Sequence, residues 1–514
     1  MVWKLGRRDT LKMFCMTAAG WALSRSTAHS SLIRQPVGQE RFIPQDAPNI
    51  LFIMTDDQRQ DALSAYGNTI LKTPNVDRIA TEGMRFTEAF VTNSLCAPSR
   101  ASFLTGLYSH AHGIITNGAS ESIFRNQPGL QDNQTTFVHL LKQAGYHTGL
   151  VGKWHLRSLP SGFDRWIILP GGGGPYNDPE MLTAGMRIKL RGYADDVVGD
   201  QALMFLQQRP KDRPFCLLYN FKAPHRNWMP APRHEKAFEN VEIPVPRTFN
   251  EKSARKTEMA IADMPDFFKR GVPETLPRDD RKRLNYQQLV KNYYRTLLSV
   301  DENVGRVLEY LDKNDLAKNT VVIYSSDNGF FLGEHDGLYD KRLMYEPSIR
   351  VPLILRYPQR IKPGRVDSSR LLLNIDVAPT LLELAGVPVP NWMHGRSCLL
   401  LLEERETPWR DAFLYEFYEY PAEHCARKHR GIRTSDWKLI HFWEQPEEWE
   451  LYDLRTDPDE THNLAARREQ SGRIRELKAR LAELRREVGD VDPPGPSPVS
   501  LPCVNGKVPP PTTL

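Results

Sequence analysis

Two pairs of oxygen-bearing side chains stand just behind two apolar runs of the sequence. Asp56 and Asp57 come after one run, and Asp327 and Asn328 come after the other. Uninterrupted apolar runs are typical of buried strands in a parallel sheet, and ligands of such sheets bind beyond the carboxyl ends of the strands. Oxygen ligands without a thiolate suit Ca²⁺ or Mg²⁺ better than Zn²⁺. The two pairs therefore predict one site for a hard divalent cation, with an exposed turn or helix cap as the plainer alternative.

The segment 96–106 carries a second set of chemical groups. It reads Cys-Ala-Pro-Ser-Arg-Ala-Ser-Phe-Leu-Thr-Gly. Pro98 can open a helix, because its φ is preset and it has no N–H to leave unbonded. A helix N-terminus presents free N–H groups and partial positive charge, which suits an anionic ester. Arg100 lies one turn along, where its planar fork of donors can hold an oxyanion or the side chain at 96. The plainer alternative is that Cys96 is a small buried apolar residue.

This segment resembles the signature of the type I sulfatases, which belong to the alkaline phosphatase-like superfamily. The resemblance implies that a formylglycine-generating enzyme oxidises Cys96 to formylglycine after translation. It also implies a two-step covalent mechanism, in which the hydrated aldehyde attacks sulfur, the alcohol leaves, and sulfate is then expelled. In the family one divalent cation, usually calcium, assists this chemistry, and Mg²⁺ is the alternative. The ligands implied by the matching positions are Asp56, Asp57, Cys96 as formylglycine, Asp327 and Asn328.

Other segments match catalytic positions of the family in the expected order. The segment 152–155 resembles the family's third motif, which implies that Lys153 holds sulfate and formylglycine and that His155 contacts the formylglycine hydroxyl. The segment 223–225 resembles the source of a second histidine, which makes His225 the implied proton donor to the leaving oxygen. Lys341 matches the sulfate-binding lysine. Taken singly, each residue would more often be a surface charge or a packed histidine. Together with Cys96 and Arg100 they indicate a complete catalytic set.

Several segments look most like the N-acetylglucosamine-6-sulfatase branch, namely 93–96, 223–225, 340–346 and 418–421. This likeness implies a sulfated sugar as substrate, and we expect the 6-O-sulfate of N-acetylglucosamine in host or environmental glycans. The expected sugar-binding residues are Asp340, Arg342 and His424. Alternatives are an iduronate-2- or aryl-sulfatase, a phosphonate or phosphate ester hydrolase of the same superfamily, and a glycan-binding protein without turnover.

The elements that must position these residues alternate between strands and helices. Apolar runs at 49–55 and 320–324 predict buried strands, and helical spacing of apolar residues predicts helices within 134–144, 195–208 and 298–311. This alternation indicates an α/β fold, and the family resemblance implies a large mixed, mostly parallel sheet flanked by helices. No Gly-Lys-Ser follows the run Gly171–Gly174, so we interpret that run as a flexible loop rather than a phosphate cradle.

The pattern changes from about residue 408. Short strands are predicted at 413–420, 437–442 and 449–452, before a charged helix with one apolar face. We expect a catalytic domain over 47–400, a smaller α+β subdomain over 408–490, and a proline-rich extended or disordered tail over 491–514. The apolar face of the helix consists of Ile474, Leu477, Leu481, Leu484 and Val488.

The first 28 residues are predicted to be an export signal. Arg7 and Arg8 resemble a twin-arginine motif, the stretch 13–23 is apolar, and 26–28 offers a small-residue cleavage site. We therefore expect a periplasmic or secreted protein. The alternative is that this stretch forms an amphipathic first helix.

The composition narrows the class of protein and its partners. With 514 residues, 40% of them hydrophobic and 25% charged, we expect an ordinary soluble globular protein of two domains with extra segments. It has no run of eighteen or so apolar residues, so we expect no transmembrane helix. The net charge is +5, and the first 28 residues hold +4 of it, so charge indicates no nucleic-acid partner. The six cysteines match no zinc or CxxC pattern; without Cys15 and Cys96, four remain for two disulfides or none.

Overall fold

The computed structural model of the chain describes residues 46–118, 129–130, 134–251, 273, 275–420, 422 and 426–492. The predicted export signal, His424 and residues 493–514 of the predicted tail lie outside the described residues.

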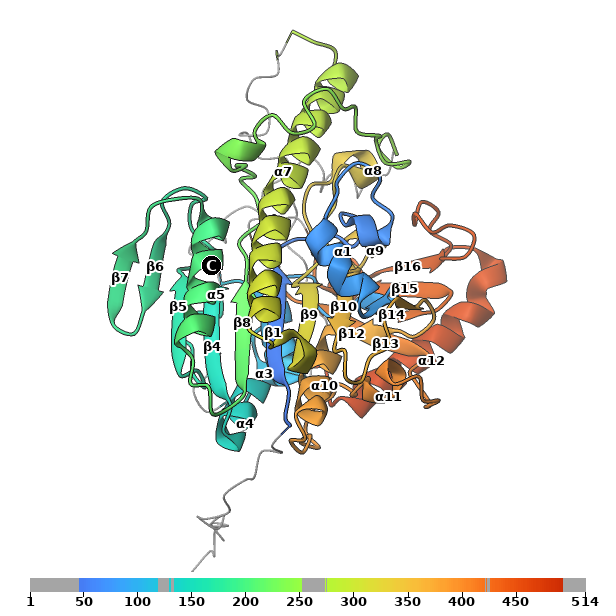
Figure 1. The fold of residues 1–514 in the computed structure, drawn as a ribbon. Coiled ribbons are helices and arrows are strands. Elements are labelled where there is room, and N and C mark those ends of the chain that lie inside the picture. Colours follow the sequence, from blue (N-terminus) through green and yellow to red (C-terminus); the bar gives the residue numbers. More distant parts are fainter. Residues whose placement is uncertain are drawn as a thin grey trace, which may run out of the picture. The chain divides into compact units, whose positions relative to one another are not determined.

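A ten-stranded sheet forms the centre of the fold (Figure 1). Its strand order is β11-β2-β10-β9-β1-β8-β4-β5-β6-β7. The strands from β9 through β1, β8 and β4 to β5 are parallel, whereas β10 and β6 pair antiparallel with both of their neighbours. This mixed, mostly parallel sheet flanked by helices confirms the predicted fold class. The strands are β1 (Asn49–Thr55), β2 (Met84–Phe86), β4 (His147–Lys153), β5 (Arg165–Leu169), β6 (Glu180–Thr183), β7 (Met186–Lys189), β8 (Phe215–Asn220), β9 (Thr320–Ser326), β10 (Leu353–Arg356) and β11 (Arg365–Asp367), and a separate pair joins β3 (Ala89–Phe90) to β12 (Leu372–Leu373).

The register of the two central strands decides how the acidic residues meet. In the parallel pair β1 and β9, Asn49 lies opposite Thr320 and Thr55 lies opposite Ser326. The next residues of the two strands are Asp56 and Asp327, so the two predicted metal-binding segments leave the sheet side by side. The predicted meeting of both segments at one edge of the sheet is confirmed.

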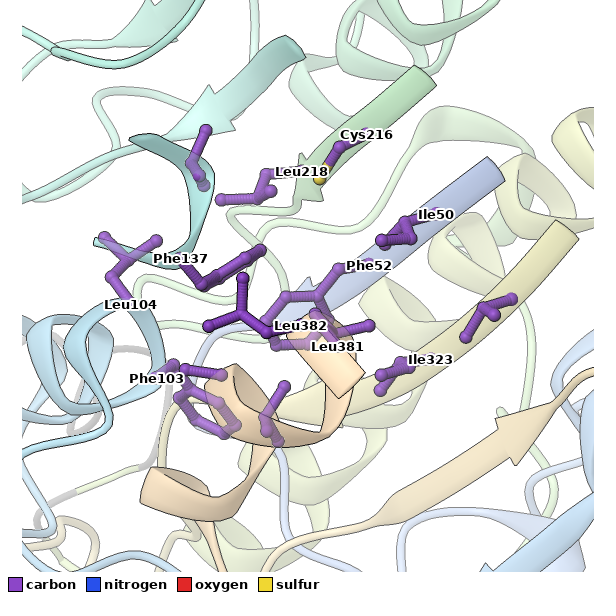
Figure 2. Close-up of a cluster of buried hydrophobic side chains, with 14 of the residues drawn as sticks. Ile50, Phe52, Phe103, Leu104, Phe137, Cys216, Leu218, Ile323, Leu381 and Leu382 are labelled. Carbon is purple, nitrogen blue, oxygen red and sulfur yellow. The ribbon is translucent and has the colours of Figure 1, made fainter. Parts of the chain in front are cut away.

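Helices cover both faces of the sheet because β1 is apolar on both sides. Ile50 and Phe52 belong to one buried cluster, and Leu51 and Ile53 belong to another. The first cluster includes Phe103 of α2, whose ring centre is 5.5 Å from that of Phe52, together with side chains of α4 and α10 (Figure 2). The second cluster packs against α1, α5 and α7, and Figure 1 shows α5 and α7 in front of the central strands. This two-sided burial holds the carboxyl ends of the strands in fixed positions.

The structure has a helix at each predicted place, but one of these helices is longer than predicted. The helices predicted within 134–144 and at 195–208 are α4 and α5, whereas the one predicted at 298–311 extends over 36 residues as α7. The start of α7 is rich in charge, so no apolar stripe marks it in the sequence. No helix of the described ranges is long and apolar enough to cross a membrane. The helices are α1 (Pro74–Thr81), α2 (Cys96–Thr105), α3 (Ser109–His112), α4 (Phe137–Ala144), α5 (Ala194–Gln208), α7 (Arg278–Lys313), α8 (Glu334–Gly337), α9 (Glu346–Ile349), α10 (Val377–Leu384), α11 (Leu399–Leu402) and α12 (Ser471–Glu487).

A second, antiparallel sheet of four strands follows the ten-stranded sheet in the chain. It consists of β13 (Ala412–Phe417), β14 (His429–Thr434), β15 (Trp437–Phe442) and β16 (Glu448–Asp453), and Leu477, Leu481 and Leu484 of α12 belong to its core. The sequence analysis missed β14, because its arginines hide the strand pattern. Arg433 is 3% exposed and pairs with Glu88 at 2.9 Å, which is how a charged strand is buried here.

The described cysteines form no disulfide. Cys96, Cys216 and Cys398 are buried free thiols, and Figure 2 shows Cys216 of β8 within the apolar core. Cys425 and Cys503 lie outside the described residues.

Candidate active site

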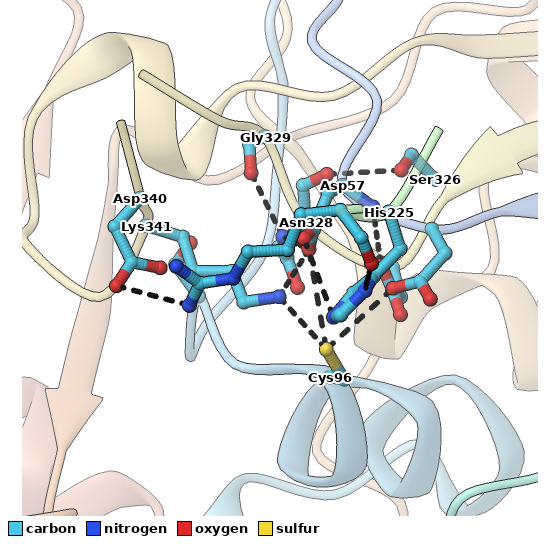
Figure 3. A network of polar contacts seen from close by, with 12 residues as sticks. Asp57, Cys96, His225, Ser326, Asn328, Gly329, Asp340 and Lys341 are labelled. Carbon is cyan, nitrogen blue, oxygen red and sulfur yellow. Dashed lines mark hydrogen bonds and ion pairs between the residues drawn. The ribbon is translucent and has the colours of Figure 1, made fainter. Parts of the chain in front are cut away.

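The carboxyl ends of four adjacent parallel strands carry the candidate site. Asp56 follows β1, Asp327 follows β9, Lys153 ends β4, and His225 lies in the loop after β8. Helix α2 begins at Cys96, whose Sγ lies 3.5 Å from Oδ1 of Asp56. Figure 3 shows Cys96 at the start of this helix, with its side chain turned toward Asp57, His225 and Lys341. Residues from positions 56 to 327 therefore meet at one point, as expected for a site beyond the carboxyl ends of a parallel sheet.

Cys96 is fully buried at the first position of α2. Burial raises the pKa of its thiol to about 12, although the positive charges of Lys153 and Lys341 partly oppose this shift. Cysteines that act as nucleophiles have lowered pKa values, because the thiolate is the reactive form. The unmodified thiol is therefore poorly suited to catalysis, which agrees with its expected conversion to formylglycine.

Four buried oxygen-bearing side chains form a group whose chemistry fits a cation. One carboxylate oxygen from each of Asp56, Asp57 and Asp327 lies within 4.8 Å of the other two. Oδ2 of Asp57 and Oδ1 of Asn328 have no hydrogen-bond partner among the described residues. Buried oxygens without a partner cost free energy unless a donor or cation satisfies them. Three carboxylates and one amide oxygen are the ligands of a hard divalent cation, so the residues present fit the predicted metal.

Two buried lysines compensate the carboxylates. Lys153 Nζ donates to Asp56, and Lys341 Nζ donates to Asp57 and lies 2.9 Å from Sγ of Cys96. Burial alone would lower the pKa of Lys341, but the charge of Asp57 outweighs it and raises this pKa. The ammonium group of Lys341 is thus charged at neutral pH beside residue 96.

Arg100 links helix α2 to the candidate metal-binding residues. Its Nε donates to Oδ2 of Asp327 at 2.8 Å, and its Nη1 donates to the Lys153 carbonyl at 3.0 Å. Burial and the charge of Asp56 raise the pKa of Asp327 to about 6, although Arg100 opposes the shift. Nη2 of Arg100 has no hydrogen-bond partner in the described ranges. The sequence analysis expected the donors of Arg100 to hold an oxyanion or the side chain at 96, and this prediction stays untested.

Two half-buried histidines, His155 and His225, complete the group. Nδ1 of His225 lies 2.6 Å from the Arg226 carbonyl, which only accepts, so Nδ1 carries the proton and Nε2 is turned to Asp57 at 3.7 Å. Burial and the charge of Lys153 lower the pKa of His225 well below its usual value. The same two causes lower the pKa of His155, whose Nδ1 has no partner among the described residues. Both rings are neutral at pH 7 in this state.

Comparisons with known proteins decide the family. The Sulfatase family model matches residues 48–387, and the model of the N-sulphoglucosamine sulphohydrolase C-terminal region matches residues 333–487. The chain belongs to the sulfatase family. The sulfatase is 42% identical to N-acetylglucosamine-6-O-sulfatase of Bacteroides thetaiotaomicron, over 87% of this chain and 88% of that protein. It is 30% identical to human N-acetylglucosamine-6-sulfatase, over 81% of each chain. The enzyme is a sulfuric ester hydrolase, and the family implies formylglycine and a metal ion.

Solved structures show the same fold. One, in complex with its substrate D-glucosamine-2-N,6-O-disulfate, is 41% identical to this sulfatase and has a TM-score of 0.79, with 87% of this chain and 99% of that chain covered. Phosphonate monoester hydrolase of Agrobacterium radiobacter has a TM-score of 0.69 at 23% identity, over 86% of this chain and 96% of that one. At that identity the likeness shows a shared fold alone.

The residues expected to bind sugar form a charged cluster next to the sulfatase site. Asp340 and Arg342 are 1% and 4% exposed, and Oδ2 of Asp340 lies 2.5 Å from Nη1 of Arg342. Arg226 approaches Asp340 to 3.6 Å, and Glu419 approaches Arg342 to 3.7 Å. Figure 3 shows Asp340 and Lys341 in the same polar network as Asp57 and Asn328. The structure thus brings two of the three expected residues together, and His424 lies outside the described residues.

The sequence analysis missed part of the sulfatase site. Lys222 and Tyr176 are both buried beside His225, and the glycine run interpreted as a flexible loop includes a turn at Gly171–Gly173 packed against Lys153. A signal for Lys222 was present, because it directly precedes the segment 223–225 that was matched to the family. Nothing in the sequence pattern pointed to Tyr176 or to the contacts of the turn.

Proposed function

We propose that this sulfatase hydrolyses sulfate monoesters of sugars and that its substrate is the 6-O-sulfate of N-acetylglucosamine in glycans. The observation that carries the proposal is the 42% identity to an N-acetylglucosamine-6-O-sulfatase over 87% of the chain. The buried Asp340–Arg342 pair beside Lys341 supports it, since charged groups held in place suit the recognition of sugar hydroxyls.

One modified side chain and one cation complete the chemistry. Formylglycine at position 96, made by a formylglycine-generating enzyme, supplies an aldehyde hydrate as nucleophile, and Ca²⁺, or Mg²⁺ in its place, supplies positive charge for sulfate oxygens. The residues that would hold the cation are Asp56, Asp57, Asp327 and Asn328, whose buried oxygens include two without a hydrogen-bond partner in the described part of the chain.

The protein's own residues bind the ester and manage its protons. Lys153 and Lys341 place two ammonium groups next to residue 96, where they attract the sulfate group and the charge that develops on it. Arg100 fixes Asp327 and offers Nη2 to the side chain at 96. The ring of His225 is oriented by the hydrogen bond from its Nδ1 to the Arg226 carbonyl. Its Nε2 is therefore placed to take up a proton and pass it to the leaving oxygen. The negative charge of bound sulfate favours this proton uptake.

Sulfate release from a panel of sulfated sugars tests the proposal. The protein is produced together with a formylglycine-generating enzyme, conversion of residue 96 is checked by peptide mass, and Cys96→Ala is the control. We expect release from N-acetylglucosamine-6-sulfate and none from Cys96→Ala. Release from another sugar alone would discard the substrate and keep the reaction. Turnover of phosphonate or phosphate esters in preference to every sulfate ester would contradict the proposed physiological reaction.

A further inference from the structure

Lys222 is a buried ammonium group for which the mechanism above has no role. It follows β8, is 4% exposed, and has no carboxylate within ion-pair distance among the described residues, in contrast to Lys153 and Lys341. Its Nζ lies 4.6 Å from the centre of the Tyr176 ring. Burial of a cation without an anionic partner costs free energy. A bound anion from outside the chain would offset this cost.

Tyr176 positions Lys222 and His225 together. Its ring lies under the ammonium group of Lys222, and its hydroxyl donates a 2.6 Å hydrogen bond to the carbonyl of His225. The ring is 2% exposed and stacks on Tyr193, with ring centres 5.6 Å apart. One immobile side chain therefore sets the place of a cation and of the histidine that serves the leaving oxygen.

The turn at Gly171–Gly173 packs against the side chains of both Lys222 and Lys153. A Cβ at Gly173 would lie 3.4 Å from Cγ of Lys222 and 3.6 Å from Cδ of Lys153, and a Cβ at Gly172 would lie 3.8 Å from Nε2 of His155. Gly173 has a φ of +115°, which side-chain-bearing residues rarely adopt. The backbone of this turn thus covers the alkyl chains of two lysines whose charges repel each other.

The electrostatic surroundings of Lys222 are those of the sulfate site. Burial and the charge of Lys153 lower the pKa of Lys222 to about 8, and Asp56, Asp195 and Asp57 oppose the shift. An anion between the two ammonium groups would relieve their repulsion. A sulfate monoester carries its negative charge on three oxygens. Lys153 and Lys341 supply two ammonium groups, so one oxygen is left for a third donor.

We propose that Lys222 is a third lysine of the sulfate site, which donates to an oxygen of the scissile sulfate group, and that Tyr176 is its positioning residue. This inference rests on the proposed sulfatase function. It adds a substrate-binding residue that stands on the loop after β8, whereas Lys153 comes from β4 and Lys341 from the segment before α9.

The test compares Lys222→Met with the parent enzyme in turnover and in binding. Methionine keeps the length and apolar character of the side chain and removes only the charge. We expect kcat/KM to fall about 10- to 100-fold on N-acetylglucosamine-6-sulfate and on a small aryl sulfate alike. Calorimetric titration of inorganic sulfate into the Cys96→Ala protein should show a similar loss of affinity when Lys222→Met is added. Lys362→Met, at a 73% exposed lysine, is the matched control.

Three outcomes would overturn the inference. These are unchanged sulfate affinity, a loss confined to the sugar substrate, or equal losses in the Lys362→Met control. A purely structural lysine would lower the unfolding temperature when replaced, whereas removal of a buried unpaired charge should raise it in the anion-free protein, and Lys222→Leu serves as a second variant for this measurement. The binding arm needs no turnover, so a wrong sugar or an inactive preparation leaves it decisive.

Discussion

Nζ of Lys341 lies 2.9 Å from Sγ of Cys96, although 245 residues separate the two in the sequence. Lys341 also donates to Asp57, so one ammonium group touches both the proposed nucleophile position and a carboxylate of the candidate metal-binding group. This contact couples the charge needed for sulfate binding to the position of residue 96.

Replacement of Lys341 should therefore remove catalysis more than folding. For Lys341→Met we expect kcat/KM on a sulfate ester to fall by about 10²- to 10³-fold, because a fixed positive charge next to the reacting group is lost. Steady-state kinetics on the formylglycine form checks this. Lys313→Met, at a 69% exposed lysine of α7, should leave the kinetics unchanged. A change below about threefold in Lys341→Met would contradict the assigned role.

Calcium should stabilise the folded enzyme through the acidic cluster. At a calcium concentration of about 100 times the dissociation constant we expect a gain of about 2.7 kcal/mol in the free energy of unfolding, reversed by a chelator. Asp327→Asn should weaken this effect, whereas Asp200→Asn, at a 60% exposed carboxylate, should not. Thermal unfolding with and without Ca²⁺, together with metal analysis of the purified protein, measures both. Equal stabilisation of both variants would place the ion elsewhere.

Asp340 should discriminate sugar substrates from simple ones. Asp340→Asn keeps the shape of the side chain and weakens its ion pair with Arg342. We expect kcat/KM to fall about 10- to 100-fold on N-acetylglucosamine-6-sulfate and to stay within about threefold on a small aryl sulfate, which has no sugar hydroxyls to lose. Parallel losses on both substrates would mean that the pair acts on the sulfate site itself.

The stability of the enzyme should fall in alkaline solution because of His110. Its Nδ1 lies 2.8 Å from Oε2 of Glu416 and its Nε2 lies 3.0 Å from the Val488 carbonyl, so both nitrogens face acceptors and the ring is charged. Burial opposes the charge, but Glu416, Val488 and Asp490 outweigh it and raise the pKa from 6.5 to about 9. His394, stacked on the ring at 5.9 Å, has a pKa lowered to about 4 and stays neutral.

A group whose pKa is raised by folding stabilises the protein fully at a pH below its pKa in the unfolded chain. This stabilisation is lost as the pH rises through its pKa in the folded protein. The free energy of unfolding should therefore decrease by up to about 3 kcal/mol between pH 6.5 and pH 9.5. Urea unfolding across this range checks the size of the decrease. In His110→Gln the decrease should be smaller, and an identical pH profile for the variant would assign it to other groups.

Export through the twin-arginine pathway remains our proposal for the first 28 residues. In a host with that pathway, Arg7→Lys combined with Arg8→Lys should leave the enzyme in the cytoplasm, because the pathway reads the arginine pair. Arg25→Lys is the matched control. Cell fractionation and immunoblotting measure the distribution, and export of the double variant at the parent level would exclude this route.

The sequence was sufficient for the elements whose signals are local. The apolar runs that form β1 and β9 are buried on both faces. The strands and the acidic residues that follow them could therefore be recognised without a structure. The motif around Cys96, together with Lys153, His225 and Lys341, identified the family and the reaction. The first part of helix α7, before residue 298, and strand β14 escaped because charged residues dominate the start of the helix and two arginines interrupt the strand pattern.

Only the tertiary structure decided which of the charged side chains lie close enough to attract or repel one another. Arg100 pairs with Asp327 across 227 residues, and Lys222 approaches Lys153 only because β8 lies beside β4 and the turn at Gly173 packs over both. Neither relationship follows from a motif, since the cost of a buried charge depends on what the sheet register and the covering loop place within a few ångströms of it.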